Sequence, residues 1–364
     1  QYQKATFVDW SQLVVFSLAG VVFAWMGFSY TSMVYGRLLA ILTANALRIS
    51  FARWRPSLRF SWAALKEILS FGAGVHAKRL LDYAAQQGDN LVVGKVMGMG
   101  ALGLYDKAFS TMNRFLSRLN NAGPGVMFRI FSVIHEDADR FRRAYQKVIM
   151  SASLVGFPVF AGLYVTAPQL MLVLFGDQWV ESAAPFRVLC ISAVFKLLNS
   201  YASSGVQAAG RVWSEVWRQA LLLLIMIVGI FVLRPWGPTG AALAVTIATV
   251  VMTMLMHTLL VRATGLGFGD IVRPLMPALG CSAIVAFVAV VTEDLARRVA
   301  GDPSAWALLA VQAASCAVVG AAFVLFAPMR DLRQLVRDVS KDAVPAAVQR
   351  HRWAQAYWRW SDGY

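Results

Sequence analysis

The sequence is poor in charged residues, and poor in acidic residues above all. Charged side chains make up 15% of its 364 residues, with 19 Asp and Glu against 34 Lys and Arg. So small a share of charge, together with 58% hydrophobic residues and a mean hydropathy of +0.58, excludes an ordinary soluble globular domain. The composition is typical of a polytopic membrane protein, with room for about ten helices of about 20 apolar residues each.

Cysteines and catalytic motifs are also scarce. Cys190, Cys281 and Cys316 stand far apart inside apolar runs, without the spacing of a metal site, so we interpret them as packing residues. The sequence has no GxSxG, no HExxH and no Gly-rich phosphate loop followed by Lys-Ser/Thr. These absences argue against an enzyme and give no reason to expect a cofactor, a metal or a nucleic-acid partner.

Apolar stretches bounded by charges, Gly or Pro predict ten membrane-spanning helices. In chain order they are Ser11–Tyr30, Ser32–Arg48, Phe71–Val96, Ala101–Val133, Val148–Phe175, Pro185–Ala208, Val216–Leu233, Thr239–Leu260, Leu275–Val291 and Ser304–Phe326. The third to fifth are longer than one bilayer crossing, so we expect tilts or kinks there. Breaks are expected at Gly123-Pro124-Gly125 and at Pro158.

The distribution of Lys and Arg predicts the orientation. If residue 1 is cytoplasmic, 21 basic residues fall in cytoplasmic segments and only Arg234, Arg297 and Arg298 fall outside. The positive-inside rule therefore predicts that both ends of this chain are cytoplasmic. From residue 330 a basic tail rich in Trp and Tyr follows, which either lies on the anionic inner leaflet or is disordered.

Ten basic residues remain within or at the edges of the predicted spans: Arg37, Lys78, Arg79, Lys95, Lys107, Arg114, Arg118, Arg129, Arg187 and Lys196. An ionisable group at membrane depth costs about 2.5–3.5 kcal/mol on insertion scales, so such groups tend to face protein or a wet cavity. Snorkelling or internal pairing explains the four that lie near predicted ends or off the polar faces, Lys78, Lys95, Arg129 and Arg187.

Polar residues recur at helical spacing in three of the spans. In the third span one face carries His76, Arg79, Tyr83, Gln86 and Asn90, flanked by Asp82 and Asp89. The fourth span carries Lys107, Thr111, Arg114, Arg118 and Asn121 at the same spacing. The sixth span adds Lys196, Asn199, Ser203 and Gln207.

We interpret these faces as the lining of a cavity for an anionic, hydroxyl-rich cargo. Guanidinium groups match phosphate oxygens, so Arg79, Arg114 and Arg118 are expected to meet phosphate, while Tyr and Asn suit sugar hydroxyls. Asp82 and Asp89 are candidates for coupling to protons or cations, although Asp82 is also spaced to pair with Arg79. His76 is either a proton carrier or a hydrogen-bonded structural group.

Several short motifs resemble those of one family. They are Asp89-Asn90-Leu91-Val92-Val93-Gly94-Lys95, Ala101-Leu102-Gly103-Leu104-Tyr105, Arg142-Arg143-Ala144-Tyr145, Leu174-Phe175-Gly176-Asp177-Gln178-Trp179 and Ala208-Ala209-Gly210-Arg211. Their order and spacing are similar to those of Wzx-type polysaccharide flippases. The WzxC/TuaB-like branch of the multidrug/oligosaccharidyl-lipid/polysaccharide exporter superfamily is the part of that family they resemble most.

The resemblance implies an all-α, polytopic, MATE-like exporter bundle, with two six-helix lobes around a central cavity and rocking of one lobe against the other. On this chain it assigns residues 1–65 to the last two helices of the N-lobe and a basic linker. It further assigns residues 66–262 to a complete C-lobe, 263–328 to an additional helix pair and 329–364 to the tail. About four helices of the family's N-lobe have no counterpart in this sequence, which suggests an upstream portion.

The resemblance also implies a function. The expected cargo is an undecaprenyl-diphosphate-linked oligosaccharide, moved across the bacterial inner membrane for lipopolysaccharide or exopolysaccharide synthesis. Membrane lipids and polymerase or chain-length-regulator proteins are the implied partners.

Three alternatives stay open. A multidrug or organic-ion exporter of the same superfamily would present carboxylates and aromatic rings rather than Arg. A polysaccharide polymerase or ligase would carry a large periplasmic loop, and the longest outside connection here, 292–303, is short. A non-transporting scaffold is the third.

Overall fold

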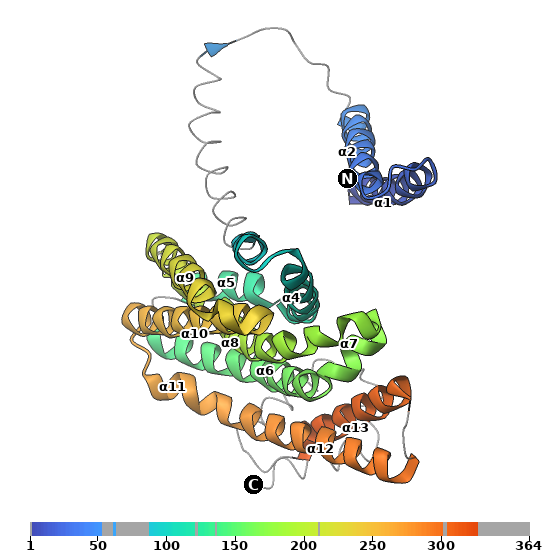
Figure 1. Ribbon diagram of the computed structural model, residues 1–364. Helices are drawn as coiled ribbons and strands as arrows, with labels where there is room; N and C mark the ends of the chain where they lie inside the picture. Colours follow the sequence, from blue (N-terminus) through green and yellow to red (C-terminus); the bar gives the residue numbers. More distant parts are fainter. Residues whose placement is uncertain are drawn as a thin grey trace, which may run out of the picture. The chain divides into compact units, whose positions relative to one another are not determined.

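The computed structural model describes residues 2–52, 61–62, 87–120, 123–134, 137–209, 212–300 and 304–326. Within these ranges all regular structure is helical (Figure 1). The chain divides into two compact units, residues 1–76 and 77–364. The predicted tail and most of the third span lie outside the described residues, and the predicted domain boundaries stay a prediction.

The first unit is a helical hairpin of α1 (Tyr2–Trp25) and α2 (Thr31–Ala52). The two helices are antiparallel, because Asp9 near the start of α1 forms a 3.7 Å ion pair with Arg48 near the end of α2. The turn between them uses Gly27 in the left-handed region, with φ at 89°. The hairpin closes tightly where Gly36 of α2 contacts the backbone of Gly20 in α1.

The second unit is built around one central helix, α8 (Ala183–Ala208), which packs mainly against four others. Those four are α4 (Met99–Asn120), α5 (Gly123–Ile134), α6 (Ala138–Val165) and α10 (Gly237–Thr264). A helical segment over 87–97 precedes α4, and α9 (Val212–Leu233) packs on α10. Large apolar side chains fill the interior, among them Phe186 and Leu189 of α8 and Ile149 of α6, all fully buried.

Two further helices cover α6. The first is α12 (Met276–Ala300), which packs along α6, and the second is α13 (Ala305–Phe326), which packs on α12 (Figure 1). Large apolar side chains such as Phe287 and Val290 stay exposed on α12. Exposed apolar faces of this kind suit contact with lipid rather than with water.

The helices lie where the sequence predicts them, in every predicted span whose residues are described. By length and composition, five helical stretches are apolar enough to cross a membrane: Thr6–Trp25, Ala138–Val165, Trp217–Thr264, Phe268–Val299 and Ala305–Leu325. The third of these joins α9 and α10 and corresponds to two predicted spans.

One predicted helix break is confirmed and the other is wrong. The expected break at Gly123-Pro124-Gly125 separates α4 from α5. Pro158, by contrast, lies inside an unbroken α6, buried among neighbouring helices. A packed helix tolerates the one hydrogen bond that proline removes. The chain bends instead at Thr166, before α7 (Ala167–Phe175), whose first turn holds Pro168 where no N–H partner is needed.

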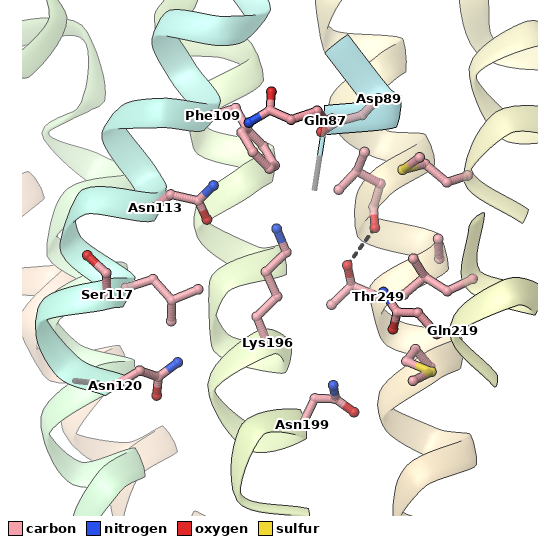
Figure 2. Close-up of a pocket in the computed structure, with 16 residues that line it drawn as sticks. Gln87, Asp89, Phe109, Asn113, Ser117, Asn120, Lys196, Asn199, Gln219 and Thr249 are labelled. Carbon is pink, nitrogen blue, oxygen red and sulfur yellow. Dashed lines mark hydrogen bonds between the residues drawn. The ribbon is translucent and has the colours of Figure 1, made fainter. Parts of the chain in front are cut away.

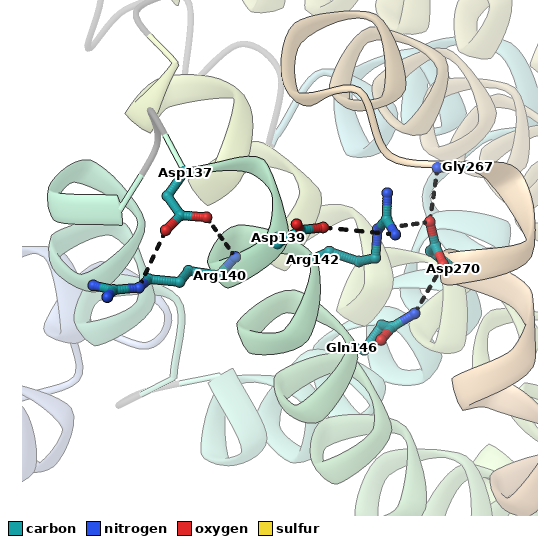
Figure 3. Close-up of polar contacts among 7 residues, drawn as sticks. All are labelled: Asp137, Asp139, Arg140, Arg142, Gln146, Gly267 and Asp270. Atoms are coloured by element: carbon teal, nitrogen blue, oxygen red, sulfur yellow. Dashed lines mark hydrogen bonds and ion pairs between the residues drawn. The ribbon is translucent and has the colours of Figure 1, made fainter.

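A cluster of polar residues ties the start of α6 to the short helix α11 (Phe268–Val272), as Figure 3 shows. Asp270 forms a 3.3 Å ion pair with Arg142 and accepts hydrogen bonds from the Gln146 side chain and the Gly267 backbone. Asp137 caps α6 through the backbone N–H of Arg140 and also pairs with its guanidinium. Arg142 and Gln146 of α6 therefore hold the link between α10 and α12 in place.

We predict that Gly36→Ala loosens the α1–α2 hairpin and that Gly20→Ala does not. A Cβ at Gly36 would lie 3.0 Å from the backbone nitrogen of Gly20, whereas a Cβ at Gly20 meets nothing within 4 Å. Overpacking typically costs about 1–3 kcal/mol. Both variants gain the same helix propensity, so the difference between their melting temperatures isolates the packing. Equal melting temperatures for the two variants would contradict the prediction.

Candidate functional site

A polar cavity of about 600 Å³ lies inside the second unit. Its walls are formed by residues 87–89 and by the helices α4, α8, α9 and α10. Its amide and hydroxyl side chains are Gln87, Asn113, Ser117, Asn120, Asn199, Gln219 and Thr249. Among the described lining residues two are charged, Asp89 and Lys196. We call this space the polar cavity.

Helical spacing accounts for the walls. On α4, Asn113, Ser117 and Asn120 follow one another at intervals of four and three, which places them on one face. On α8, Lys196 and Asn199 are three residues apart and share a face in the same way. Figure 2 shows Lys196 rising between α4 and α10, with Phe109 and Asn113 on one side and Thr249 on the other.

Contacts inside the polar cavity leave some of its hydrogen-bonding capacity unused. Asn120 accepts a hydrogen bond from Ser200, and Thr249 accepts one from Ser192, both at 3.2 Å. The side-chain oxygen of Asn199 is buried, and within the described part of the chain it has no hydrogen-bond partner. A buried, unpaired amide oxygen costs free energy, so it suits a site that a polar ligand or water completes.

The two charges of the polar cavity are held by different contacts. Asp89 is 2% exposed and accepts a 2.7 Å hydrogen bond from the Tyr105 hydroxyl and a 2.8 Å bond from the Asn90 backbone. The ammonium of Lys196 lies 4.5 Å from the centre of the Phe109 ring, a cation–π contact. Because the two groups have opposite signs and line one cavity, each lowers the electrostatic cost of the other.

Two of the three predicted cations of α4 line a second, smaller cavity of about 310 Å³. Arg114 and Arg118 line it together with Thr111, Phe115, Leu174 and Phe175. Thr111 is 2% exposed, and its hydroxyl has no partner among the described residues. Both guanidinium groups are exposed, and no described carboxylate lies within ion-pair distance of either. We call this space the arginine cavity.

The structure therefore divides the predicted site residues between two cavities. Asp89, Lys196 and Asn199 line the polar cavity, and Arg114 and Arg118 line the arginine cavity. Lys107, one turn before Thr111, lies 5.1 Å and 5.0 Å from the rings of Phe175 and Trp179. Asn90 bonds to Asp106 at 3.2 Å, beside the polar cavity. His76, Arg79, Asp82, Tyr83, Gln86 and Asn121 lie outside the described residues.

Several lining residues were not predicted from the sequence. Gln87, Asn113, Ser117, Asn120, Gln219 and Thr249 are in this group. The interval of four and three in Asn113, Ser117 and Asn120 was a signal that would have found three of them. It lies on a different face of α4 from the cations, and the interpretation followed the charged residues.

A third cavity, of about 770 Å³, is almost entirely apolar. It lies between α6 and α7 on one side and α12 and α13 on the other, with walls that include Leu154, Leu163, Val285 and Leu309. It shares Phe115 with the arginine cavity. Among the described residues, no group of three His, Cys, Asp or Glu side chains is placed to hold a metal ion.

The long apolar helices define a multi-pass membrane protein, which is all-α within the described residues. The structure is similar to the lipid II flippase MurJ in its inward closed conformation, with a TM-score of 0.65 at 15% sequence identity. The likeness covers 89% of this chain and 66% of MurJ. The expected all-α exporter bundle is confirmed.

Residues 1–184 match the family described as polysaccharide biosynthesis protein, and the chain belongs to that family. It is 24% identical to the lipopolysaccharide biosynthesis protein WzxC of Escherichia coli K12 over 57% of this chain and 43% of WzxC. It is 26% identical to the teichuronic acid biosynthesis protein TuaB of Bacillus subtilis 168 over 47% of this chain and 36% of TuaB. The chain thus spans less than half the length of either relative, and the resemblance found in the motifs is confirmed.

We predict that Tyr105→Phe destabilises the second unit. The variant leaves the buried Asp89 carboxylate without the hydroxyl that donates to it, which costs roughly 1–3 kcal/mol. Tyr164→Phe is the matched control, because that ring is 42% exposed. Thermal unfolding of the purified protein measures the difference. A Tyr105→Phe protein that melts with the control would show that this hydrogen bond contributes nothing.

Proposed function

We propose that this chain is part of a flippase that moves lipid-linked oligosaccharide repeat units across the bacterial inner membrane, for lipopolysaccharide or exopolysaccharide synthesis. The polar cavity is the observation that carries the proposal. Its seven amide and hydroxyl side chains lie among membrane helices, where polar groups that bind nothing are costly. Amides and hydroxyls donate and accept hydrogen bonds in the way that sugar hydroxyls require.

The diphosphate of the carrier lipid is assigned to the arginine cavity. Arg114 and Arg118 are one helical turn apart, so both guanidinium groups can approach one diphosphate. Planar guanidinium groups bind phosphate oxygens in pairs, and these two have no described acidic neighbour that would compete. In the polar cavity, by contrast, Lys196 already faces Asp89. Arg79, on the preceding span, is proposed to join the phosphate site.

The polyprenyl chain is assigned to the apolar cavity. That cavity borders the arginine cavity at Phe115, so a lipid whose phosphates bind Arg114 and Arg118 can extend its hydrocarbon into it. Burying hydrocarbon among Leu, Val and Ala side chains leaves no polar group unpaired. A single lipid-linked oligosaccharide thus has a chemically matched surface for its glycan, its phosphates and its tail.

The proposed mechanism is alternating access, in which one lobe rocks against the other. Both ends of this chain are proposed to be cytoplasmic, on the Lys and Arg distribution. Asp89, with Asp82 and His76, remains our proposal for ion or proton coupling. An organic-cation exporter fits less well, because the one described carboxylate of the polar cavity is offset by Lys196.

We predict that Arg114→Ala with Arg118→Ala abolishes surface polysaccharide while the protein still inserts in the membrane. The pair supplies the proposed phosphate contacts, and a hydrogen bond to a charged group typically contributes about 1.5–3 kcal/mol. Arg129→Ala with Arg143→Ala is the control, since it removes two exposed arginines from outside the cavities. The measurement is surface polysaccharide in a strain that depends on the full-length protein. Normal polysaccharide in the Arg114/Arg118 double variant would refute the phosphate assignment.

A further inference from the structure

Asp89 and Lys196 are parts of one packed arrangement. The Tyr105 hydroxyl donates to Asp89, and the Tyr105 ring stacks on the Phe109 ring with their centres 5.7 Å apart. The Phe109 ring in turn carries the Lys196 ammonium at 4.5 Å. Asp89 and Lys196 are therefore positioned by two neighbouring aromatic residues of α4.

The Asp89 carboxylate has little freedom to leave the cavity. Tyr105 is fully buried, so its hydroxyl is a fixed donor. The second carboxylate oxygen is held at 2.8 Å by the backbone N–H of Asn90, and the Asn90 side chain is anchored to Asp106. A ligand that enters the polar cavity must therefore meet the Asp89 carboxylate at a fixed position as well as the Lys196 ammonium.

This placement discriminates between ligands by charge. An uncharged sugar can donate a hydroxyl to Asp89 or to the free oxygen of Asn199 and can accept from Lys196. A sugar that carries a carboxylate would also be attracted to Lys196, but it would be repelled by Asp89 in the same small space. Like charges that share an enclosed, weakly polar site repel strongly, and such repulsion is a common source of specificity.

We propose that Asp89 is a specificity-determining residue, which makes the polar cavity a subsite for uncharged sugar residues and excludes uronic acids. The inference rests on the proposed function, because it takes the glycan to enter this cavity. It adds the class of sugar that is accepted there and the residue that selects it.

The test compares two probes that differ in charge, methyl galactoside and methyl galacturonate, on the full-length purified protein. Binding is measured by saturation-transfer NMR and by ligand-dependent melting temperature, neither of which needs transport. The unmodified protein is expected to bind the neutral sugar about tenfold more tightly or better, since like-charge juxtaposition costs at least that much affinity. Asp89→Asn keeps an oxygen that can accept from a sugar hydroxyl and removes the charge, so it is expected to raise galacturonate affinity relative to galactoside affinity about tenfold.

Two further variants guard against a folding artefact. Tyr105→Phe removes the hydroxyl but keeps the Asp89 carboxylate, so it should retain the preference for the neutral sugar at a lower melting temperature. Lys196→Gln leaves Asp89 without its counter-charge, so galacturonate binding should fall further while galactoside still binds. If Asp89→Asn does not fold, the double variant Asp89→Asn with Lys196→Gln, which removes both charges, decides the question, since it should bind galacturonate better than Lys196→Gln alone does.

The outcomes separate this inference from the function on which it rests. Equal affinities for the two sugars in the unmodified protein, or no change of preference in Asp89→Asn and Lys196→Gln, would overturn the role of Asp89 and leave the flippase proposal standing. Failure of both sugars to bind the folded protein would overturn the glycan assignment and this inference together.

Discussion

The hydrogen bond between Tyr105 and Asp89 is the interaction on which the interior of the second unit depends. It joins the helical segment before α4 to α4 itself and holds a carboxylate in a space that apolar helices surround. Without a donor and an opposite charge nearby, a carboxylate at that depth would be costly. The Lys196 ammonium supplies the charge from α8, so a helix far away in sequence meets two consecutive helical elements around one carboxylate and one ammonium.

Helix α4 has two polar faces, one toward the polar cavity and one toward the arginine cavity. The face toward the polar cavity carries the uncharged Asn113, Ser117 and Asn120, and the two charges of that cavity, Asp89 and Lys196, come from other elements. The other polar face carries Arg114 and Arg118, and no described carboxylate lies within ion-pair distance of either. One face of α4 is thus polar and uncharged, and another is cationic. Such a helix suits a ligand that has an uncharged part and an anionic part.

Helical periodicity was sufficient to locate the elements and one break, because a bilayer demands long apolar helices and glycine with proline interrupts them. It also identified Asp89, Lys196 and Asn199. Periodicity describes a face, however, and does not say which neighbour that face meets. For that reason Arg114 and Lys196 were expected in a single cavity, and the Asn113 face was overlooked. The break predicted at Pro158 is wrong for a similar reason. The packing that keeps α6 helical around this proline comes from neighbouring helices, which periodicity does not identify.

The position of α4 connects the two cavities mechanically. It has 22 residues, which corresponds to a rod of about 33 Å. Its two polar faces cannot move independently, because one straight helix rotates as a unit. Any rotation that shifts Arg114 and Arg118 also shifts Phe109 and Asn113 against Lys196. A ligand that rotates α4 when it binds in the arginine cavity would therefore also change the shape of the polar cavity.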